Sequence, residues 1–538
     1  MEEIEFWKTR LNTLDKRIKA FPQGYRQNIA ILGDDEKEIS YLLENYFKTN
    51  KLKEIIYIHT SASHSDRKSF FKSVVFSLLS EYLNKNETFD NLLNCTCTSL
   101  STTVVFIKDI IKRNTSPSFL DILEVVNKFI NESGKRCIFI IENLLALKRV
   151  FPSFHNDFSK FIVLQRNCMV ILTSLDIKES EKTLYSDLNF LFGNFEKILL
   201  NETNFLENYK YLKNSLIPLP CSPFFISFFV NIFGSNIVYY NFIKEMMKEK
   251  YINNDEDISI ISIVRHAIYE QEAYFFQKFI REIDIIESNF KNPYLVIKLL
   301  LALSEGYIRK KELASLHIID QKDLTVKLQR LCDLNYVENL GNIYTIKDPL
   351  FSFWLSHVFK LSFCPPLLDW HKRNILFEKK MHETISLFKE DFFKDKVKKI
   401  LELITSFKND TLKIGKTSYR LPLVTKSRLI SYPEKNLHFL IAEGEEIIFA
   451  GIKEVLVEDS DIFDFIEKGK MIRGKGVKKI FISLDTFSSS AKLAAKNNKL
   501  IVWDINELND LMRTYHKPVI SFDRQCESRV ESENFSNF

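Results

Sequence analysis

A polar turn near the start of the chain has part of the spacing that binds phosphate groups. In the pattern G-x-x-x-x-G-K-[ST], glycines let backbone amides approach the phosphates, the lysine neutralises them and the hydroxyl holds magnesium. The turn begins with Gly33 and ends with Ser40, which match the first and last positions of the pattern. Glu38 replaces the second glycine and Ile39 replaces the lysine, so Lys37 is the only cation in the turn.

Four carboxylates crowd the same turn, at positions 34, 35, 36 and 38. A carboxylate about 4–6 Å from a phosphate charge is repelled by roughly 3–4 kcal/mol at an effective dielectric near 20. Carboxylates also favour the first turn of any helix, because they offset the helix dipole. An altered phosphate loop and an ordinary helix start therefore both stay open, and we expect ATP and Mg²⁺ as cofactors only if the altered loop still binds them.

Two apolar runs end in residues that a nucleotide site uses. The first ends in Glu142, which could hold a metal ion, and Asn143, whose amide cannot act as a general base. The second ends in Thr173, whose hydroxyl could face a phosphate or cap the next turn. The candidate nucleotide-binding residues are Gly33, Lys37, Ser40, Glu142 and Thr173.

Short apolar runs alternate with helical patterns in this part of the chain. The runs are Asn28–Gly33, Glu54–Thr60, Cys137–Glu142, Met169–Thr173 and Lys197–Leu200. Between them, residues 36–47 and 69–83 have apolar side chains at every third or fourth position, which is typical of helices. The alternation predicts an α/β fold with a parallel sheet, and ligands bind such sheets beyond the carboxyl ends of the strands.

The middle of the chain predicts a winged helix. Helices are expected at 299–304, 309–316 and 321–334, followed by strands at 336–338 and 343–346 that are joined at Gly341-Asn342. In the third helix, leucines recur every three or four positions and bury one face. The basic residues that fall elsewhere and could meet DNA are Lys322, Lys327 and Arg330. A packing role for this module stays open as well.

The C-terminal part returns to strands and helices. After a helical stretch over 379–407, strands are expected at 412–419, 427–432, 437–442, 446–453, 479–484 and 500–504. Lys453 has the place of the lysine in the E-x-K motif of nucleases, in which two acids hold a metal and the lysine orients the attacking water. Position 451 is Gly, and residues 428–431 contain no acid, so we expect no metal to be held there.

A loop over 468–479 is the best basic patch, with six basic residues and three glycines. The candidate nucleic-acid contacts in it are Lys470, Arg473 and Lys475. A cationic loop can bind phosphate backbones through counterion release. An ordinary solvated loop before a strand explains the same sequence equally well. The net charge of +5, from 75 basic and 70 acidic residues, permits a local nucleic-acid site without demanding one.

Composition and apolar patterning predict a globular chain in the cytoplasm. With 45% hydrophobic and 27% charged residues, the sequence excludes collagen-like and wholly disordered proteins. The N-terminus is acidic where a signal peptide is basic, and the eight cysteines include no Cys-x-x-Cys pair. Phe224–Phe233 is densely apolar for only about ten residues, where a membrane span needs about 20. We therefore expect a buried helix there and no membrane association.

Several runs resemble prokaryotic ATPases of the AAA+/STAND type. They are Phe21–Gly33, Ile138–Asn143, Ile171–Ser174, Leu191–Phe195 and the D-P-L-F-x-x-W-L run Asp348–Leu355. The run Ala491–Leu511 resembles the end of the restriction-endonuclease-like, Mrr-like domains that are fused to such ATPases. By this resemblance, Gly33 and Ser40 would lie in the phosphate loop, Glu142 at the magnesium-binding strand end and Thr173 on the sensor strand.

The resemblance also implies a domain order. It is a P-loop ATPase-like α/β core over 1–205, a helical lid over 206–290, a winged helix over 291–365, a helical linker over 366–408, a restriction-endonuclease-like α/β domain over 409–520 and a disordered tail over 521–538. Because both sites depart from their motifs, the leading hypothesis is a catalytically degenerate protein. It would bind a protein partner, such as a related ATPase, with DNA as a second candidate partner. A weakly active ATPase coupled to a nuclease-like DNA-binding domain is the alternative, and the oligomeric state stays open.

Overall fold

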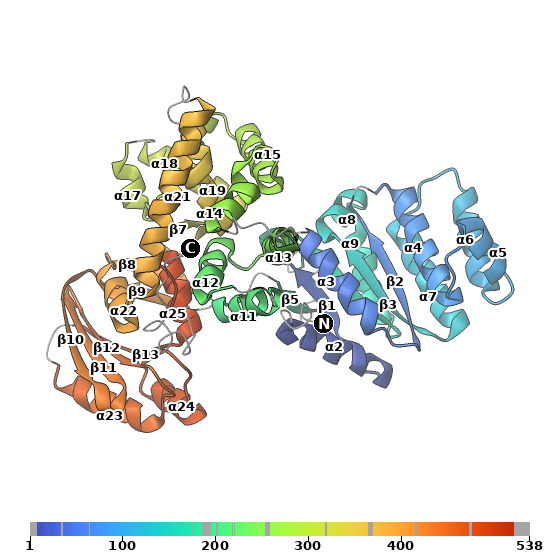
Figure 1. The fold of residues 1–538 in the computed structure, drawn as a ribbon. Helices are drawn as coiled ribbons and strands as arrows, with labels where there is room; N and C mark the ends of the chain where they lie inside the picture. Colours follow the sequence, from blue (N-terminus) through green and yellow to red (C-terminus); the bar gives the residue numbers. More distant parts are fainter. Residues whose placement is uncertain are drawn as a thin grey trace. The chain divides into compact units, whose positions relative to one another are not determined.

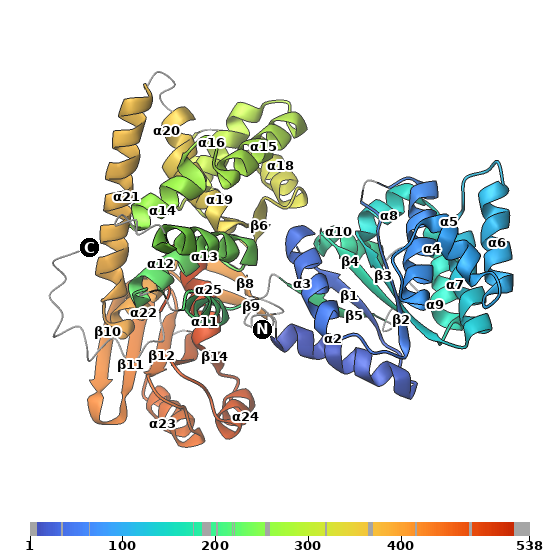
Figure 2. The same cartoon turned by 45° about the vertical axis from the view of Figure 1, so that its right-hand side comes forward.

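The chain forms two compact units, residues 1–203 with 236–238, and residues 204–235 with 239–538. The computed structural model describes residues 8–33, 36–63, 65–175, 177–184, 195–200, 203–217, 219, 221–252, 259–317, 320–363, 369–414, 417–472 and 476–520. The motif residues 191–194, the candidates Arg473 and Lys475 and the tail 521–538 lie outside this description. Figures 1 and 2 show the elements of each unit.

The first unit is built on a five-stranded parallel sheet in the order β2-β3-β4-β1-β5. The strands are β1 (Asn28–Leu32), β2 (Ile55–Ser61), β3 (Arg136–Glu142), β4 (Cys168–Ser174) and β5 (Phe195–Leu199). Strands covered on both faces read as continuous apolar runs, which is why the sequence predicts their positions closely. The predicted α/β fold with a parallel sheet is confirmed.

Helices cover both faces of this sheet (Figure 1). They are α2 (Lys8–Ala20), the 3₁₀ turn η1 (Phe21–Gln23), α3 (Glu36–Thr49), α4 (Arg67–Leu83), α5 (Phe89–Thr96), α6 (Ser101–Lys112), α7 (Phe119–Ser133), α8 (Leu144–Val150), α9 (Phe154–Leu164) and α10 (Ile177–Lys182). Helices α4 to α9 share one large apolar core with the sheet. Helix α3 packs on the opposite face, where the rings of Phe47 and Tyr57 lie 5.3 Å apart.

The described residues between β5 and the wing are mainly helical. The first helices of this stretch are α11 (Phe205–Ser215), α12 (Pro223–Phe233), α13 (Ile237–Ile252), α14 (Ile260–Val264), the π-helical turn η4 (Arg265–Tyr269) and α15 (Tyr274–Asn289). Helix α12 is the expected buried helix, because seven of its apolar side chains lie in the core. Within the described residues, no helix is long and apolar enough to cross a membrane.

The helices and strands expected between 299 and 346 are present. They are α16 (Pro293–Ser304), α17 (Lys310–Ser315), α18 (Gln321–Asp333), β6 (Val337–Asn339) and β7 (Tyr344–Ile346), and β6 and β7 pair antiparallel. Next come α19 (Pro349–Trp354), η5 (Leu355–Phe359), α20 (Lys360–Phe363), α21 (Trp370–Phe392) and α22 (Lys396–Thr405). Asp348 caps α19 by accepting from the amides of Leu350 and Phe351, and Trp354 is fully buried.

A second sheet has the order β10-β11-β12-β13-β14. Its elements are β10 (Val424–Tyr432), η6 (Pro433–Lys435), β11 (Leu437–Gly444), β12 (Ile447–Lys453), α23 (Asp459–Lys470), β13 (Val477–Ser483), α24 (Ser489–Asn497), β14 (Ile501–Trp503) and α25 (Ile505–Thr514). The first three strands are antiparallel and the last three are parallel. Stacked rings of Phe439, Phe449 and Phe465 form the core between the sheet and α23.

The prediction of one continuous strand over 412–419 is wrong. Residues 412–419 form two strands, β8 (Asp410–Ile414) and β9 (Thr417–Leu421), which pair antiparallel as a hairpin. The sequence between them is Gly415-Lys416, which lies outside the described residues. A two-residue link that contains glycine favours a hairpin over a continuous strand, and the alternating pattern on both sides concealed it.

Strand β8 also pairs with the turn between β6 and β7. The amide of Asn342 donates to the Thr411 carbonyl at 3.0 Å, and the amide of Lys413 donates to the Leu340 carbonyl at 2.9 Å. A Cβ at Gly341 would lie 2.1 Å from the Thr411 oxygen, so only glycine allows this approach. The wing of the expected winged helix is therefore tied to the C-terminal hairpin by backbone hydrogen bonds.

A buried carboxylate reinforces the same junction. Asp410 has no exposed surface and accepts hydrogen bonds from Arg309 at 2.7 and 2.8 Å, from the Tyr515 hydroxyl at 2.8 Å and from the Lys408 amide at 3.1 Å. Burial alone would raise the pKa of Asp410, but the donors from Arg309 and Tyr515 hold it below its ordinary value. The buried charge thus has partners at the start of α17, at the end of α25 and in the turn just before β8.

Two glycines with positive φ allow the wing contact to be tested. Gly341 and Gly306 have φ of 109° and 92°, but a Cβ at Gly306 would meet nothing within 4 Å. We expect Gly306→Ala to cost about 1 kcal/mol of unfolding free energy through backbone strain alone. Gly341→Ala should cost a further 1–3 kcal/mol or so through the clash, and it should speed amide hydrogen exchange at Lys413. Urea unfolding and hydrogen exchange measure both effects, and equal results for the two variants would contradict the described contact.

Candidate functional site

Four of the sequence candidates meet at the carboxyl edge of the first sheet. Gly33 follows β1, Glu142 and Thr173 come from the ends of β3 and β4, and Ser40 lies on α3. The Gly33 amide donates to the Ser174 carbonyl at 3.1 Å, which fixes the exit of β1 against β4. The backbone of the fifth candidate, at position 37, lies in α3, and its side chain is outside the described part of the chain.

Glu142 is bound by side chains of the protein itself. Its Oε2 accepts a hydrogen bond from the Ser40 hydroxyl at 3.0 Å, and its Oε1 contacts His59 Nε2. Burial alone would raise the pKa of Glu142, but the hydrogen bond and charge of His59, with the Ser40 hydroxyl, outweigh burial and hold this pKa below its ordinary value. The carboxylate and the hydroxyl that would share a magnesium ion thus bind each other.

His59 is the site residue that sequence reasoning missed. It lies near the end of β2, and residue 61 on that strand pairs in register with Glu142 on β3. A histidine that interrupts an apolar run close to a strand's carboxyl end is the signal that could have identified it. The imidazole needs no phosphate to explain its position, because Glu142 supplies its partner.

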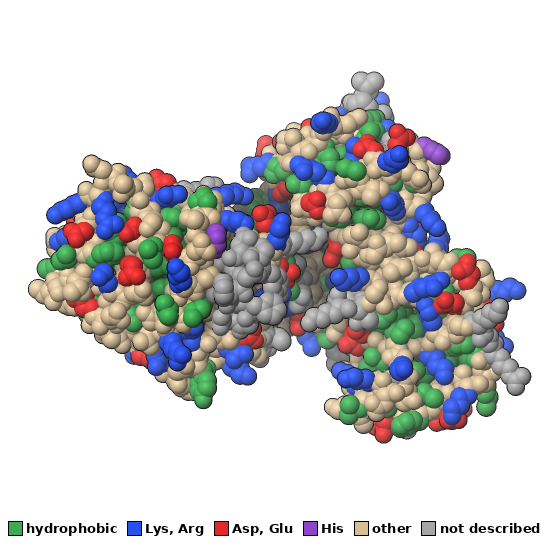
Figure 3. Space-filling view, turned by 180° about the vertical axis from the view of Figure 1, so that it is seen from behind, with side chains coloured by type: hydrophobic (Ala, Val, Ile, Leu, Met, Phe, Trp, Pro, Cys, Tyr) green, Lys and Arg blue, Asp and Glu red, His purple; other side chains and the backbone are tan. Residues whose placement is uncertain are grey.

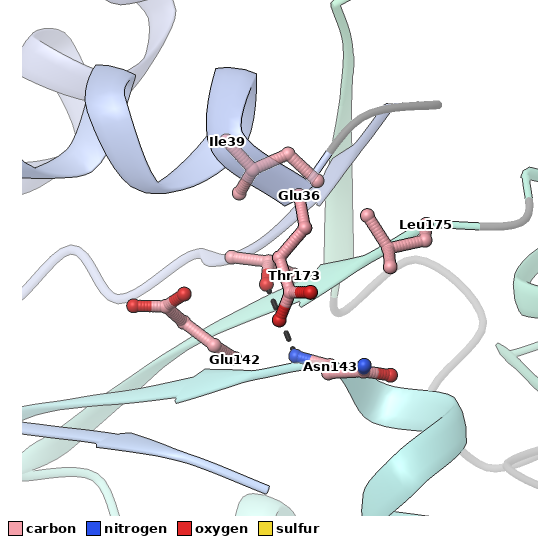
Figure 4. A pocket seen from close by; sticks show the side chains of 6 residues that line it. All are labelled: Glu36, Ile39, Glu142, Asn143, Thr173 and Leu175. Atoms are coloured by element: carbon pink, nitrogen blue, oxygen red, sulfur yellow. Dashed lines mark hydrogen bonds between the residues drawn. The ribbon is translucent and has the colours of Figure 1, made fainter. Parts of the chain in front are cut away.

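A second set of hydrogen bonds closes the other side of the edge, and Figure 4 draws the one between Asn143 and Thr173. The backbone amide of Asn143 donates to the Thr173 hydroxyl at 3.2 Å, and the side-chain nitrogen of Asn143 donates to Ser63 Oγ at 3.0 Å. Ser63 in turn donates to Glu36 at 2.7 Å. Asn143 has a φ of 64° and caps α8 through the Ala146 amide. The Thr173 hydroxyl therefore connects the ends of β3 and β4. The residue that caps the following helix, α8, is Asn143.

Ile39 fills the space above Gly33. The isoleucine is 2% exposed, and a Cβ at position 33 would lie 3.2 Å from it and 3.4 Å from Leu200. The cavity left at this edge has a volume of about 10 Å³, which is about the room that one water molecule needs. Figure 4 shows the residues that line it, Glu36, Ile39, Glu142, Asn143, Thr173 and Leu175.

The nuclease-like residues of the second sheet are held in packing contacts. Lys453, at the end of β12, forms an ion pair of 2.5 Å with Asp461 on α23, and both side chains are largely buried. A Cβ at Gly451 would lie 2.9 Å from the rings of Phe465 and Phe481. Position 451 therefore has no room for a side chain. In the part of the chain that the structure describes, no group of three or more His, Cys, Asp or Glu side chains could hold a metal ion.

The basic candidates lie on two elements of the second unit. On α18, Lys322 and Arg330 are exposed, whereas Lys327 is bound to Asp323 at 2.7 Å. Lys470, at the end of α23, is exposed and pairs with Glu467 at 2.5 Å. The other two candidates of the basic loop, Arg473 and Lys475, are outside the described residues. Lys322, Lys327 and Arg330 thus all come from one helix, α18.

No protein-family model and no curated protein sequence matches this chain. Among solved structures, the Walker-type ATPase PABY2304 of Pyrococcus abyssi is similar, with 15% identity, 65% of this chain and 95% of that chain covered and a TM-score of 0.44. The ORC2 protein of Aeropyrum pernix, in ADPNP-ADP complexes, has 10% identity, coverage of 70% and 95% and a TM-score of 0.41. AMPPCP-bound DnaA of Aquifex aeolicus has 15% identity, coverage of 60% and 86% and a TM-score of 0.27.

Replacing Glu142 by glutamine tests the closed edge. A carboxylate whose pKa is lowered on folding stabilises the protein fully above its unfolded pKa, near 4.5, and this stabilisation is lost as the pH falls through the lower folded pKa. Glu142→Gln should therefore lower the unfolding free energy of the first unit by about 1–3 kcal/mol at pH 7. The difference from wild type should shrink below pH 4.5.

Urea titrations at several pH values measure this difference. The matched control is Glu44→Gln, which changes an exposed carboxylate on α3, the helix that carries Ser40. It should change the unfolding free energy at pH 7 by less than about 0.5 kcal/mol. A difference for Glu142→Gln that stays constant from neutral to acidic pH would contradict the lowered pKa of this group.

Proposed function

We propose that this protein is a catalytically degenerate ATPase-like chain that acts as a binding or assembly module. The observation that carries the proposal is the buried side chain of Ile39, which packs on Gly33 at the position of the phosphate-loop lysine. A methyl group there supplies neither the charge nor the donors that phosphates need. The module would act through contact with a protein partner or a related, active ATPase.

ATP and Mg²⁺ do not fit the described edge. Small-molecule pockets have volumes of about 300–1,000 Å³, far above the cavity beside Ile39. The two groups that would hold magnesium, Ser40 and Glu142, already satisfy each other, and His59 takes the second carboxylate oxygen. Opening the edge would break these hydrogen bonds and expose the apolar contact between α3 and β1.

A weakly active ATPase is the second candidate, and one observation favours it. Ser40 and Glu142 lie 3.0 Å apart, so the hydroxyl and the carboxylate of a magnesium site are still neighbours. Lys37 lies in the same turn and is the cation that could replace the missing lysine. This candidate requires the edge to open when nucleotide binds.

The finer domain assignments belong to the same proposal. We assign residues 1–205 to an AAA+/STAND-type core, 206–290 to a lid, 291–365 to a winged helix, 366–408 to a linker and 409–520 to a restriction-endonuclease-like domain. The element order α16-α17-α18-β6-β7 supports the winged helix. Three antiparallel strands, a helix and a parallel strand, from β10 to β13, support the last assignment. The absence of a side chain at Gly451 argues that this domain binds without cutting.

DNA is the proposed second partner, and α18 and the basic loop over 468–479 are the segments that would contact it. The wing is bound to β8, so it could enter a groove only by giving up its backbone hydrogen bonds. Helix α18 is free of that constraint and exposes Lys322, Thr325, Gln329 and Arg330. On the face seen in Figure 3, basic side chains occur on both units, interspersed with acidic ones. DNA binding would therefore be local and sensitive to salt.

Calorimetric titration of the full chain with ATP and Mg²⁺ tests the leading proposal. We expect no binding at ligand concentrations up to about 1 mM, which corresponds to a binding free energy weaker than about 4 kcal/mol. Ser40→Ala is the matched control, because it removes a magnesium ligand and leaves Ile39 in place. Micromolar affinity that is lost in Ser40→Ala would overturn the proposal and support the weak ATPase.

DNA binding should depend on the basic loop. Replacing Lys470, Arg473 and Lys475 by alanine should reduce the slope of log K against log salt by about two to three, since each phosphate contact contributes about 0.9. A matched variant with the same charge change replaces three exposed lysines of the first unit, Lys48, Lys72 and Lys112. Fluorescence anisotropy with duplex DNA over a salt series measures both slopes. Equal slopes in both variants would remove the loop from the interface.

A further inference from the structure

Strand β10 is a long sheet edge that is open to solvent. It runs over nine residues, Val424–Tyr432, where the average strand has about five or six. It pairs with β11 on one side only and ends the sheet order, as Figure 1 shows. Apart from buried Val424 and half-buried Leu429, its residues are exposed. From Thr425 onward, no described residue forms a backbone hydrogen bond with its outer side.

The other three edges of the two five-stranded sheets are protected. The amide of His59 on β2 donates to the Ser77 hydroxyl of α4 at 2.8 Å, so the helix covers that edge. The carbonyl of Leu199 on β5 accepts from Arg10 of α2 at 2.9 Å. Strand β14 is only three residues long, which is itself a common way to limit an edge. Among the described edges of the two five-stranded sheets, β10 alone has neither a cover nor a short length.

The interruptions in β10 lie at its two ends. A register shift between Val424 and Lys426 marks a bulge at the start, and Pro433 follows directly after the strand. Between these points, each residue pairs with β11 in unbroken register. Every second residue of such a strand directs its amide and carbonyl away from the neighbour. Residues 426–432 therefore offer a regular row of unpaired donors and acceptors.

The two faces of this segment differ in chemistry. Ile430 pairs in register with Phe439, and the rings of Tyr432 and Phe439 lie 5.6 Å apart, so the even-numbered side chains stand on the α23 side. That side carries, in order, Lys426, Arg428, Ile430 and Tyr432. The opposite side carries hydroxyls and one leucine, in the order Thr425, Ser427, Leu429 and Ser431. Half of the α23 side is thus basic, and the other half is apolar.

Charge decides which strand can be added. The segment contains two basic residues and no acid. Lys426 has Glu443 as its register partner on β11, whereas the partner of Arg428 is the uncharged Ile441. Like charges directly opposite each other on neighbouring strands repel, and opposite charges attract. An incoming strand is therefore favoured when it places acids beside Lys426 and Arg428.

We propose that β10 binds an extended acidic segment of a partner protein as an additional antiparallel strand. Main-chain hydrogen bonds to the open edge hold the segment, and alternate side chains give specificity, as in other cases of strand addition. Read from its N-terminus, the segment places two apolar residues beside Tyr432 and Ile430. Two acids then follow beside Arg428 and Lys426, and one residue separates each of these positions from the next.

A designed peptide tests the proposal with the full chain. The probe carries valines beside Tyr432 and Ile430, aspartates beside Arg428 and Lys426, threonine elsewhere and a fluorescent label. One control peptide has lysines in place of the aspartates, and a second is N-methylated on the amides that would face β10. Fluorescence anisotropy should show binding of the acidic peptide, with the lysine peptide at least about fivefold weaker. The N-methylated peptide should not bind, because it cannot form the ladder.

A charge reversal supplies the matched protein variants. Arg428→Glu should remove the preference, because each peptide then meets one like charge and one opposite charge on β10, so that the two affinities become similar. Arg281→Glu changes an exposed arginine on α15 and should leave both affinities unchanged. Both substitutions replace exposed side chains, and circular dichroism confirms that each variant is folded.

Three outcomes would overturn the proposal. One is equal binding of the acidic and N-methylated peptides, which would show that no strand is added. Another is a dimer of the chain itself that Arg428→Glu dissociates, without peptide binding, which would make a second copy the occupant. The third is binding of a single-stranded oligonucleotide that Arg428→Glu abolishes, again without peptide binding, which would make β10 a nucleic-acid surface.

Discussion

The carboxyl edge of the first sheet depends on one apolar contact, between Ile39 and the residues beneath it, Gly33 and Leu200. Because position 33 has no Cβ, the isoleucine packs directly against the backbone where β1 ends. This contact sets how closely α3 approaches the sheet. At that approach, Ser40 lies within hydrogen-bond distance of Glu142. The polar network at this edge is therefore a consequence of apolar packing one residue earlier in the helix.

The second unit depends on the opposite kind of constraint, a buried charge. An ionised carboxylate without surface exposure is tolerated only when donors satisfy both of its oxygens. Asp410 meets this condition with donors from Arg309, Tyr515 and the Lys408 amide. Its partners come from distant parts of the sequence, so all of them must be in place together. One carboxylate thus couples the packing of α17 and α25 to the hairpin of β8 and β9.

The sequence predicted the elements better than their contacts. Strands β1 to β4 are covered on both faces, so their apolar runs mark them to within a residue or two. The hairpin at Gly415 was missed because an alternating pattern continues through the turn. His59 was missed because its role depends on register with β3, and register is a property of two strands. The pairing of the wing with β8 was beyond prediction for the same reason, since it joins distant backbone groups.

The sequence predicted which residues form the candidate site better than it predicted whether those residues are available to a ligand. Gly33, Ser40, Glu142 and Thr173 were placed together by the rule that parallel strands end at a common edge. That Ser40 and Glu142 bind each other could not be predicted, because the distance between them depends on how deeply Ile39 packs. Local sequence thus identifies which groups meet, and tertiary packing decides whether they are available to a ligand.

Gly451 limits the routes by which this chain could change under mutation. A side chain at that position would collide with two rings at once, those of Phe465 and Phe481. Reducing either ring alone would leave a cavity in a core of stacked phenylalanines, at a cost of about 3–5 kcal/mol. An acid at position 451 therefore requires several coupled substitutions, and the early ones are each harmful. Single substitutions therefore do not lead from glycine to an acid at this position of the sheet.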